Sequence, residues 1–356
     1  MQKALVAMSG GVDSAAAALL LLKSGYDVTG ITMCLWSDSK AIPDSNDYPP
    51  DENSAEAKRI ADMLGFEHIT TALGESFRRE VIDRFIDDYK NGRTPNPCVE
   101  CNRTLKFGAL FDIADRMDIP FLATGHYARI TQDADGRFSL RKSVDSAKDQ
   151  SYFLWSIRRE RLPFILFPLG SYTKPEIRQI AAENGFTNAS RSDSQDICFI
   201  PDGDYVSFIE KNSTEDRGFE KGRFIDVNGN TLGEHNGIIN YTIGQRKGLG
   251  IALGRPMFVG EKNALCNTVT LCSDRELYKK ELSADRINLL VEDTLELPTR
   301  LEAKIRYRHT PAVATVVRTA ENELSVVFDE PQRAIAAGQS LVLYDGDRVI
   351  GGGIIK

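Results

Sequence analysis

The sequence predicts an α/β protein in which a parallel-sheet domain is followed by two small β-rich domains, the last of them a β-barrel. Over the first 200 residues or so, short apolar runs alternate with segments of helical period, an order typical of parallel sheets with right-handed crossovers. Beyond about residue 205, helical periodicity nearly disappears, and hairpin turns separate alternating strand patterns. We therefore expect domains over residues 1–205, 206–278 and 279–356.

The elements of the first domain follow from periodicity and from end signals. Asn53 with Glu56, and Thr173 with Glu176, have the spacing of capping boxes that start helices. Gly65 is placed to end a helix. The predicted elements, in order, are strand 4–8, helix 15–23, strand 28–33, helix 54–64, strand 66–69, helix 75–90, helix 103–117, strand 119–123 and helix 174–184.

The second half of the chain reads as strands joined by tight turns. Asn228-Gly229 and Asp345-Gly346 are dipeptides that favour two-residue hairpin turns. Ala312–Val317 and Leu324–Phe328 alternate apolar and polar residues, as half-buried strands do. A strand over residues 303–309 would place three basic side chains on one face, those of Lys304, Arg306 and Arg308.

Composition restricts the class of protein. The 356 residues are 42% hydrophobic and 27% charged, which is typical of a soluble globular protein, and no apolar run approaches the length of a membrane helix. Because the N-terminus enters a strand directly, we expect a cytoplasmic protein without a membrane partner. The net charge of −7 argues only weakly against a nucleic-acid partner, since local basic patches decide phosphate binding.

The segment Ser9–Ser14, SGGVDS, lies between a strand and a helix. Glycines allow close approach of the backbone to a ligand, and free amides at a helix N-terminus favour phosphate. The Gly-Lys-Ser/Thr ending of a Walker motif is absent. The segment resembles the PP-loop of the ATP pyrophosphatase superfamily, whose members cleave ATP between the α and β phosphates and adenylate a substrate oxygen.

Two of the six cysteines have the strongest chemical context. In a cytosolic chain, the spacing Cys98-Val-Glu-Cys101 favours a metal, redox or sulfur site over a disulfide scaffold. A thiolate can accept sulfur as a persulfide, and a second thiolate can release it by forming a disulfide. Cys198 is a candidate partner, although its apolar neighbours make a buried structural cysteine equally plausible. The other three cysteines, Cys34, Cys266 and Cys272, are expected to be small buried hydrophobes.

With these segments in view, the chain resembles the bacterial tRNA-specific 2-thiouridylases, which thiolate the wobble uridine of certain tRNAs. The resemblance covers essentially the whole chain. It rests on Ala7–Ser14, Thr94–Phe107, Ala123–Ala128, Lys148–Leu154, Ser194–Ile200, His235–Gly250 and Gly338–Ile354, in fixed order.

The resemblance implies roles for individual residues. Cys101 would be the nucleophile, Cys198 would carry the persulfide, and the two would form a transient disulfide. The implied ATP contacts are Ala7, Met8, Ser9, Gly10, Gly11, Val12, Asp13, Ser14, Met33 and Gly125. The implied contacts to the target base are Asn96, Pro97 and Cys98, and those to tRNA are His126, Lys148, Asp149, Gln150, Arg306, Tyr307 and Gln339. ATP with Mg²⁺, tRNA, a sulfur donor such as a cysteine desulfurase or relay protein, and a thiol reductant are the implied cofactors and partners.

Cys98 departs from the family pattern, because many members carry Asp there. Three thiols at Cys98, Cys101 and Cys198 could instead hold an iron–sulfur cluster. Two other functions also remain open: a PP-loop amidating synthetase of a small molecule, and a tRNA-binding protein without catalysis. An ATP–pyrophosphate assay with tRNA would separate these alternatives.

Overall fold

The computed structural model describes residues 1–37, 40–45, 51–186, 197–291 and 298–356. Its first domain is built on a five-stranded parallel sheet with strand order β5-β2-β1-β6-β9. The strands are β1 (Lys3–Ala7), β2 (Asp27–Cys34), β5 (Glu67–Ala72), β6 (Phe121–Thr124) and β9 (Ile165–Leu166). Since β1 lies in the centre, the segments that follow β1, β2 and β6 meet at one edge of the sheet.

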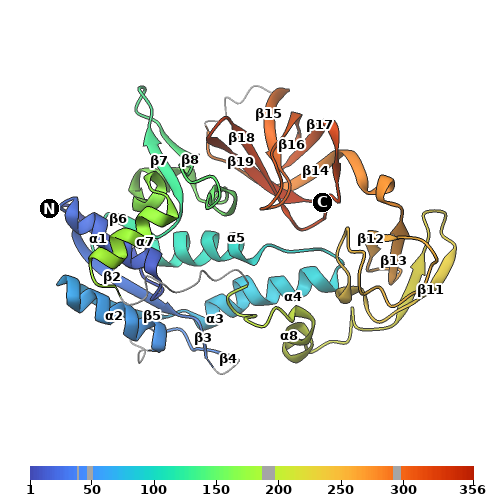
Figure 1. The fold of residues 1–356 in the computed structure, drawn as a ribbon, viewed down its shortest axis with the longest axis horizontal. Coiled ribbons are helices and arrows are strands. Elements are labelled where there is room, and N and C mark those ends of the chain that lie inside the picture. The colour runs from blue at the N-terminus through green and yellow to red at the C-terminus, as the bar shows by residue number, and fades with distance from the viewer. Residues whose placement is uncertain (38–39, 46–50, 187–196, 292–297) are drawn as a thin grey trace.

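Helices cover both faces of this sheet (Figure 1). The helices on one side are α1 (Val12–Lys23) and α2 (Glu52–Leu64), and α7 (Lys174–Glu183) lies against α1. Alternation along β1 explains the two layers: Ala4 and Val6 pack with α1 and α2, whereas Leu5 packs with Phe111 on the opposite face. The first domain therefore has an apolar layer on each face of its parallel sheet.

One of the two predicted capping boxes is present in the structure. The capping box of Thr173 and Glu176 is present at α7, and Gly65 ends α2 in the left-handed conformation with φ 79°. The N-cap of α2, however, is Asp51, whose carboxylate accepts a hydrogen bond from the Ser54 amide. The prediction of Asn53 is wrong because the helix begins earlier, at Glu52, and Asn53 lies within its first turn.

Two long helical segments run from the sheet toward the central domain (Figure 1). Each contains a π-helical stretch, in place of the uninterrupted helices predicted over 75–90 and 103–117. The first consists of α3 (Gly74–Phe77), η1 (Arg78–Ile82) and α4 (Asp83–Lys90). The second consists of α5 (Pro97–Cys101), η2 (Asn102–Ala109) and α6 (Leu110–Arg116). The second segment starts earlier than predicted because Pro97 occupies its first turn, where proline is tolerated.

The central domain holds a four-stranded sheet with order β11-β10-β13-β12. Its elements are α8 (Tyr205–Asn212), β10 (Gly222–Ile225), β11 (Thr231–His235), β12 (Phe258–Asn263) and β13 (Thr268–Cys272). A turn that contains Asn228-Gly229 joins β10 to β11, as predicted, and Gly229 has φ 85°. The predicted length of two residues is wrong, because the Asp226 amide donates to the Asn230 carbonyl and residues 227–229 lie between them.

The C-terminal domain is a six-stranded antiparallel barrel, closed by pairing of its first and last strands. Its strands are β14 (Tyr278–Leu289), β15 (Thr299–Lys304), β16 (Ala312–Ala320), β17 (Glu323–Arg333), β18 (Ser340–Asp345) and β19 (Arg348–Ile355). The predicted strand over 303–309 is wrong, because β15 ends at Lys304 and a bend and turn follow. Ile305 is buried in the barrel and the ring of Tyr307 packs against Phe153 of the first domain, so the chain must turn between them.

A hairpin of the first domain joins the barrel, which the sequence did not predict. It consists of β7 (Ala128–Gln132) and β8 (Phe138–Lys142), and Arg141 of β8 pairs with Arg348 of β19. Asp347 accepts hydrogen bonds from Arg129 at 2.7 Å and from Arg141 at 2.6 Å. The first and last domains are thus joined by strand pairing and by charge.

Short elements complete the described chain. They are β3 (Trp36–Ser37), β4 (Lys40–Ala41), η3 (Ser151–Phe153), η4 (Arg159–Phe164), η5 (Pro168–Ser171), η6 (Ile238–Asn240) and η7 (Asp274–Leu277). Within the described ranges, no helix has the length and apolar character that crossing a membrane requires.

Candidate active site

The PP-loop forms a compact turn between β1 and α1. The Ser14 hydroxyl donates to the Gly11 carbonyl at 3.0 Å and accepts from the Ser9 amide at 3.2 Å. The Ser9 and Ser14 hydroxyls are 3.5 Å apart. These contacts hold the loop in one conformation while the first amides of α1 remain at its opening. Such a loop is built to bind phosphate oxygens.

Two glycines of the predicted ATP site are required by close packing. Gly10 has φ 70°, and a Cβ there would lie 2.6 Å from the Asn53 carbonyl oxygen. A Cβ on Gly125, which follows β6, would lie 2.8 Å from the Ser14 amide nitrogen. Met33 lies near the end of β2, two residues beyond the Ile31 that pairs with Ala7 of β1. The structure thus brings Ala7–Ser14, Met33 and Gly125 to the same edge of the sheet.

The carboxylate of Asp13 is engaged by two side chains that the sequence reading missed. Lys174 donates to both carboxylate oxygens at 2.8 Å, and the Tyr127 hydroxyl donates to one of them at 2.9 Å. Lys174 is the first residue of α7, and its side chain is only 6% exposed. Asp13 therefore ties the PP-loop to α7. A capping box marks the start of α7 in the sequence, but the contact itself depends on the fold.

The predicted target-base residues Asn96 and Pro97 begin α5, and the barrel holds the loop that leads into them. The Thr94 amide donates to the Ala337 carbonyl at 2.8 Å. The Gln339 side-chain amide donates to the carbonyl of Thr94 at 2.9 Å. A Cβ on Gly338 would lie 2.9 Å from the Thr94 nitrogen. Gln339, predicted to contact tRNA, thus also positions the loop before α5.

Cys198 comes close to Cys98 and Cys101 although about 100 residues of chain separate it from them. Cys98 and Cys101 lie one turn apart on α5 and therefore share a face. Cys198 lies in a turn held by Phe199, which packs edge-on against Phe85 at 5.4 Å between ring centres. Cys101 packs against the same apolar cluster as Phe199. Each of the three thiols is close enough to influence the ionisation of another. Residues 194–196, which precede Cys198 in its family segment, lie outside the described residues.

The surroundings of these thiols oppose their ionisation. Burial raises the pKa of Cys101 to about 12. The protein groups around Cys98 and Cys198 raise the pKa of these two thiols as well, although both residues keep solvent-accessible surface. The Lys106 ammonium acts in the opposite direction on all three thiols and lowers each pKa. A thiolate is the reactive form of cysteine, so this lysine bears directly on the chemistry.

His126 lies beside Lys106 and is held in one orientation. Its Nδ1 is 2.6 Å from the Thr124 hydroxyl, and its Nε2 is 3.5 Å from Lys106 Nζ. Its ring packs against Phe107 and Phe167, both with centres 5.9 Å away. Burial, with a smaller effect of Lys106, lowers the pKa of His126 well below its ordinary value, so the ring is neutral at physiological pH. The structure places this predicted tRNA contact next to Lys106, the lysine that acts on the three thiols.

The remaining predicted tRNA residues come from two domains and meet at one place. The ring of Tyr307 packs at a tilt against that of Phe153, with ring centres 4.5 Å apart, and Lys148 and Asp149 both influence the pKa of Tyr307. Asp149 itself is buried and accepts from the Ser151 hydroxyl at 2.8 Å. Gln150 is paired with the Tyr127 backbone through its amide and its side chain. Arg306 lies close enough to Tyr152 to lower the pKa of that residue. Lys148–Gln150 and Arg306–Tyr307 thus form one composite surface.

Three other cysteines lie outside this site. Cys34 and Cys272 are buried, as predicted, whereas Cys266 is exposed. The prediction for Cys266 is wrong because it follows the fully exposed Leu265 in the turn between β12 and β13. Within the described part of the chain, no three His, Cys, Asp or Glu side chains are arranged to hold a metal ion.

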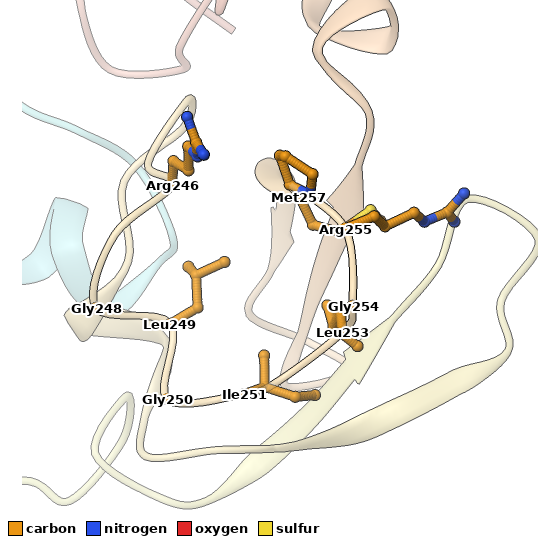
Figure 2. A pocket seen from close by; sticks show the side chains of 10 residues that line it. Arg246, Gly248, Leu249, Gly250, Ile251, Leu253, Gly254, Arg255 and Met257 are labelled. Atoms are coloured by element: carbon orange, nitrogen blue, oxygen red, sulfur yellow. The ribbon is translucent and has the colours of Figure 1, made fainter.

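A cavity of about 540 Å³ lies elsewhere, within the loop over residues 246–257 of the central domain. Figure 2 shows Leu249 and Ile251 pointing into the space that the loop encloses, with Arg246 and Arg255 on its two arms. None of the residues predicted for ATP, sulfur or base lines this cavity.

Comparisons with known proteins cover the chain from end to end. Residues 2–202 match the tRNA methyl transferase HUP domain family, residues 207–273 the tRNA methyl transferase PRC-barrel domain, and residues 279–355 the aminomethyltransferase beta-barrel domain. The tRNA-specific 2-thiouridylase MnmA of Clostridioides difficile is 46% identical over 100% of this chain and 98% of its own length. The protein of the same name from Acetivibrio thermocellus is 47% identical over 100% of this chain and 99% of its own length. With full-length relatives at this identity, the chain belongs to the tRNA-specific 2-thiouridylase family.

Proposed function

We propose that the protein uses ATP to replace O2 of the wobble uridine of tRNA with sulfur. The observation that carries this proposal is that Cys198 lies close enough to Cys101 to influence its ionisation, while Lys106, which acts on both thiols, is 3.5 Å from His126, two residues after β6 of the parallel sheet. A phosphate-binding loop supplies activation, and two neighbouring thiols supply sulfur transfer. The full-length relatives named tRNA-specific 2-thiouridylase support the same reaction.

In the first step, the PP-loop amides bind the phosphates of ATP, and uridine O2 attacks the α-phosphorus. Pyrophosphate leaves, and O2 becomes part of an adenylate, so a poor leaving group is converted into AMP. Mg²⁺ would enter with the phosphates and neutralise their charge. Asp13 is the single carboxylate in the SGGVDS segment, and Lys174 and Tyr127 already engage it. It therefore serves to hold the loop in place.

In the second step, the terminal sulfur of a Cys198 persulfide bonds to C2 of the activated base. The C2–O2 bond breaks, and AMP carries the oxygen away. The Cys101 thiolate attacks Cys198 Sγ, which breaks the persulfide S–S bond and leaves its electron pair on the transferred sulfur. The products are thiouridine and a Cys101–Cys198 disulfide, which a thiol reductant must reduce. A cysteine desulfurase or a relay protein would reload Cys198.

The composite surface explains how the base reaches the thiols. Arg306 and Lys148 offer cations to the phosphate backbone from two domains, and Lys148 lies close enough to Tyr307 to influence its pKa. The barrel also holds the loop that carries Asn96 through Gln339. A loop uridine leaves its stack at lower cost than a paired base, so a wobble position suits this approach. These features support tRNA as the substrate.

Sulfur loading tests the assignment of the two thiols. We expect Cys198→Ser protein to take no labelled sulfur from a persulfide donor. Cys101→Ser should load sulfur on Cys198 but fail to turn over, because the thiol that releases the sulfur is gone. Cys266→Ser is the matched control, since that thiol is exposed and distant from the site. Covalent label on Cys198→Ser protein would contradict the proposed order. In cells that lack the protein, mass spectrometry should show the wobble uridine unthiolated.

A further inference from the structure

The chain changes helical geometry directly after Cys101. Residues Asn102–Ala109 form a π-helix, whose hydrogen bonds run from residue i to i+5, and such segments are frequent at functional sites. In an α-helix of 3.6 residues per turn, Lys106 would lie about 140° around the axis from Cys101. The wider π-turn instead brings position 106 back to about one turn after position 101. The π-helix thus turns Lys106 toward the face that carries Cys98 and Cys101.

The neighbours of Lys106 are neutral or able to become anionic. Its Nζ is 3.5 Å from Nε2 of the neutral His126, and it acts electrostatically on Cys98, Cys101 and Cys198. Across the described ranges of the chain, it forms no ion pair with a carboxylate. Glu100, the carboxylate next to Cys101 in the sequence, is instead engaged by Arg103 at 2.7 Å and Arg84 at 3.5 Å.

We propose that Lys106 is a positioning residue of the sulfur-transfer reaction, whose charge stabilises the anionic sulfur on Cys101 and Cys198. A Cys101 thiolate must form before it attacks Cys198, and a persulfide reacts as its anion. Burial of the site works against both anions, and the ammonium offsets this cost. His126 remains neutral and so adds no competing charge. The inference rests on the proposed function for the roles of the thiols, but its test measures thiol ionisation directly.

The test is the rate of alkylation of each cysteine by iodoacetamide in the full-length protein, followed by mass spectrometry between about pH 7 and pH 10. A nearby opposite charge lowers the pKa of an acid by about one unit or more. At pH values below the thiol pKa, Lys106→Met should therefore slow alkylation of Cys101 and Cys198 about tenfold. The rate profile should move to higher pH by about one unit. Lys106→Arg should restore most of the rate, because it keeps the charge.

Two controls separate charge from damage to the fold. Arg103→Met removes a cation from the same helix, but one that is paired with Glu100, so the two alkylation rates should not change. The exposed Cys266 provides an internal reference that should react equally in every variant. Unchanged rates in Lys106→Met, or equal loss in Lys106→Met and Lys106→Arg, would overturn the inference. The proposed function fails separately, if Cys198→Ser still loads sulfur.

Discussion

Replacing Asp13 by alanine tests whether the PP-loop is anchored by charge. The Asp13 carboxylate accepts two hydrogen bonds from Lys174 and one from Tyr127. Lys174 is 6% exposed and Asp13 33% exposed, so the ion pair is largely buried. Removing one partner of a buried pair costs about 3–5 kcal/mol, and the partial exposure of Asp13 places the expected loss near the lower end, about 3 kcal/mol.

The assay uses the fluorescence of Trp155, which is buried in the first domain. Trp155 packs in one apolar cluster with Phe111 of the first domain and with Val342 of the barrel, so its fluorescence reports the loss of this packing when the first domain unfolds. For a domain of this size, 1 kcal/mol shifts the midpoint by about 2–4 °C, so Asp13→Ala should lower it by about 6–12 °C. We also expect pyrophosphate release to be abolished while tRNA still binds, because the PP-loop serves ATP.

A second substitution distinguishes lost charge pairing from lost chemistry. Asp13→Ala with Lys174→Met removes the ammonium that the carboxylate neutralised, so part of the lost stability should return. Pyrophosphate release should stay abolished, because the loop is still detached from α7. An unchanged midpoint in Asp13→Ala, or unchanged AMP formation, would refute the reasoning.

Three other substitutions probe the thiols, the tRNA surface and the central domain. Cys98→Ala should keep substantial activity, and the unmodified protein purified without oxygen should be colourless. A brown protein whose activity is lost in the Cys98→Ala variant would favour an iron–sulfur cluster. Arg306→Ala should weaken binding of cognate and non-cognate tRNA alike. It should also reduce by about one the slope of the logarithm of the binding constant against the logarithm of the salt concentration. A loss confined to one tRNA would mean that Arg306 contacts a base. Burial lowers the pKa of Lys262 from 10.5 to about 8, so the unfolded chain binds the proton more tightly than the folded protein does. The free energy of unfolding should therefore rise by at most about 3 kcal/mol as the pH is raised from about 8 to 10.5. Lys262→Met should lack this rise in urea unfolding followed by circular dichroism, and parallel curves for both proteins would contradict it.

Local features of this protein could be predicted from the sequence because they depend on neighbouring residues. The PP-loop turn needs glycine at position 10 and a helix start directly after it. The capping box at Thr173 and the hairpin at Asn228-Gly229 likewise involve contacts across a few residues. The family resemblance located Cys101 and Cys198, although their proximity could not be worked out from spacing.

The tertiary structure decided the features that depend on distant contacts. Strand β15 ends at Lys304, short of the predicted residue 309, because Tyr307 must reach Phe153 in another domain. Ile305 packs inside the barrel, and the next residues turn out of it toward the first domain. The hairpin over 128–142 extends the barrel sheet, which no local pattern indicates.

The active site shows the same division. The sequence contains Lys106 five residues after Cys101, a spacing that an α-helix would place on different faces. Leu105 and Phe107 pack into two different apolar clusters, and this packing sets the π-helical geometry of residues 102–109. Only this geometry turns Lys106 toward the thiols. Sequence therefore determined which chemical groups the protein carries and where the chain turns locally. Packing between distant segments decided which of those groups meet, because burial of apolar side chains depends on the whole fold.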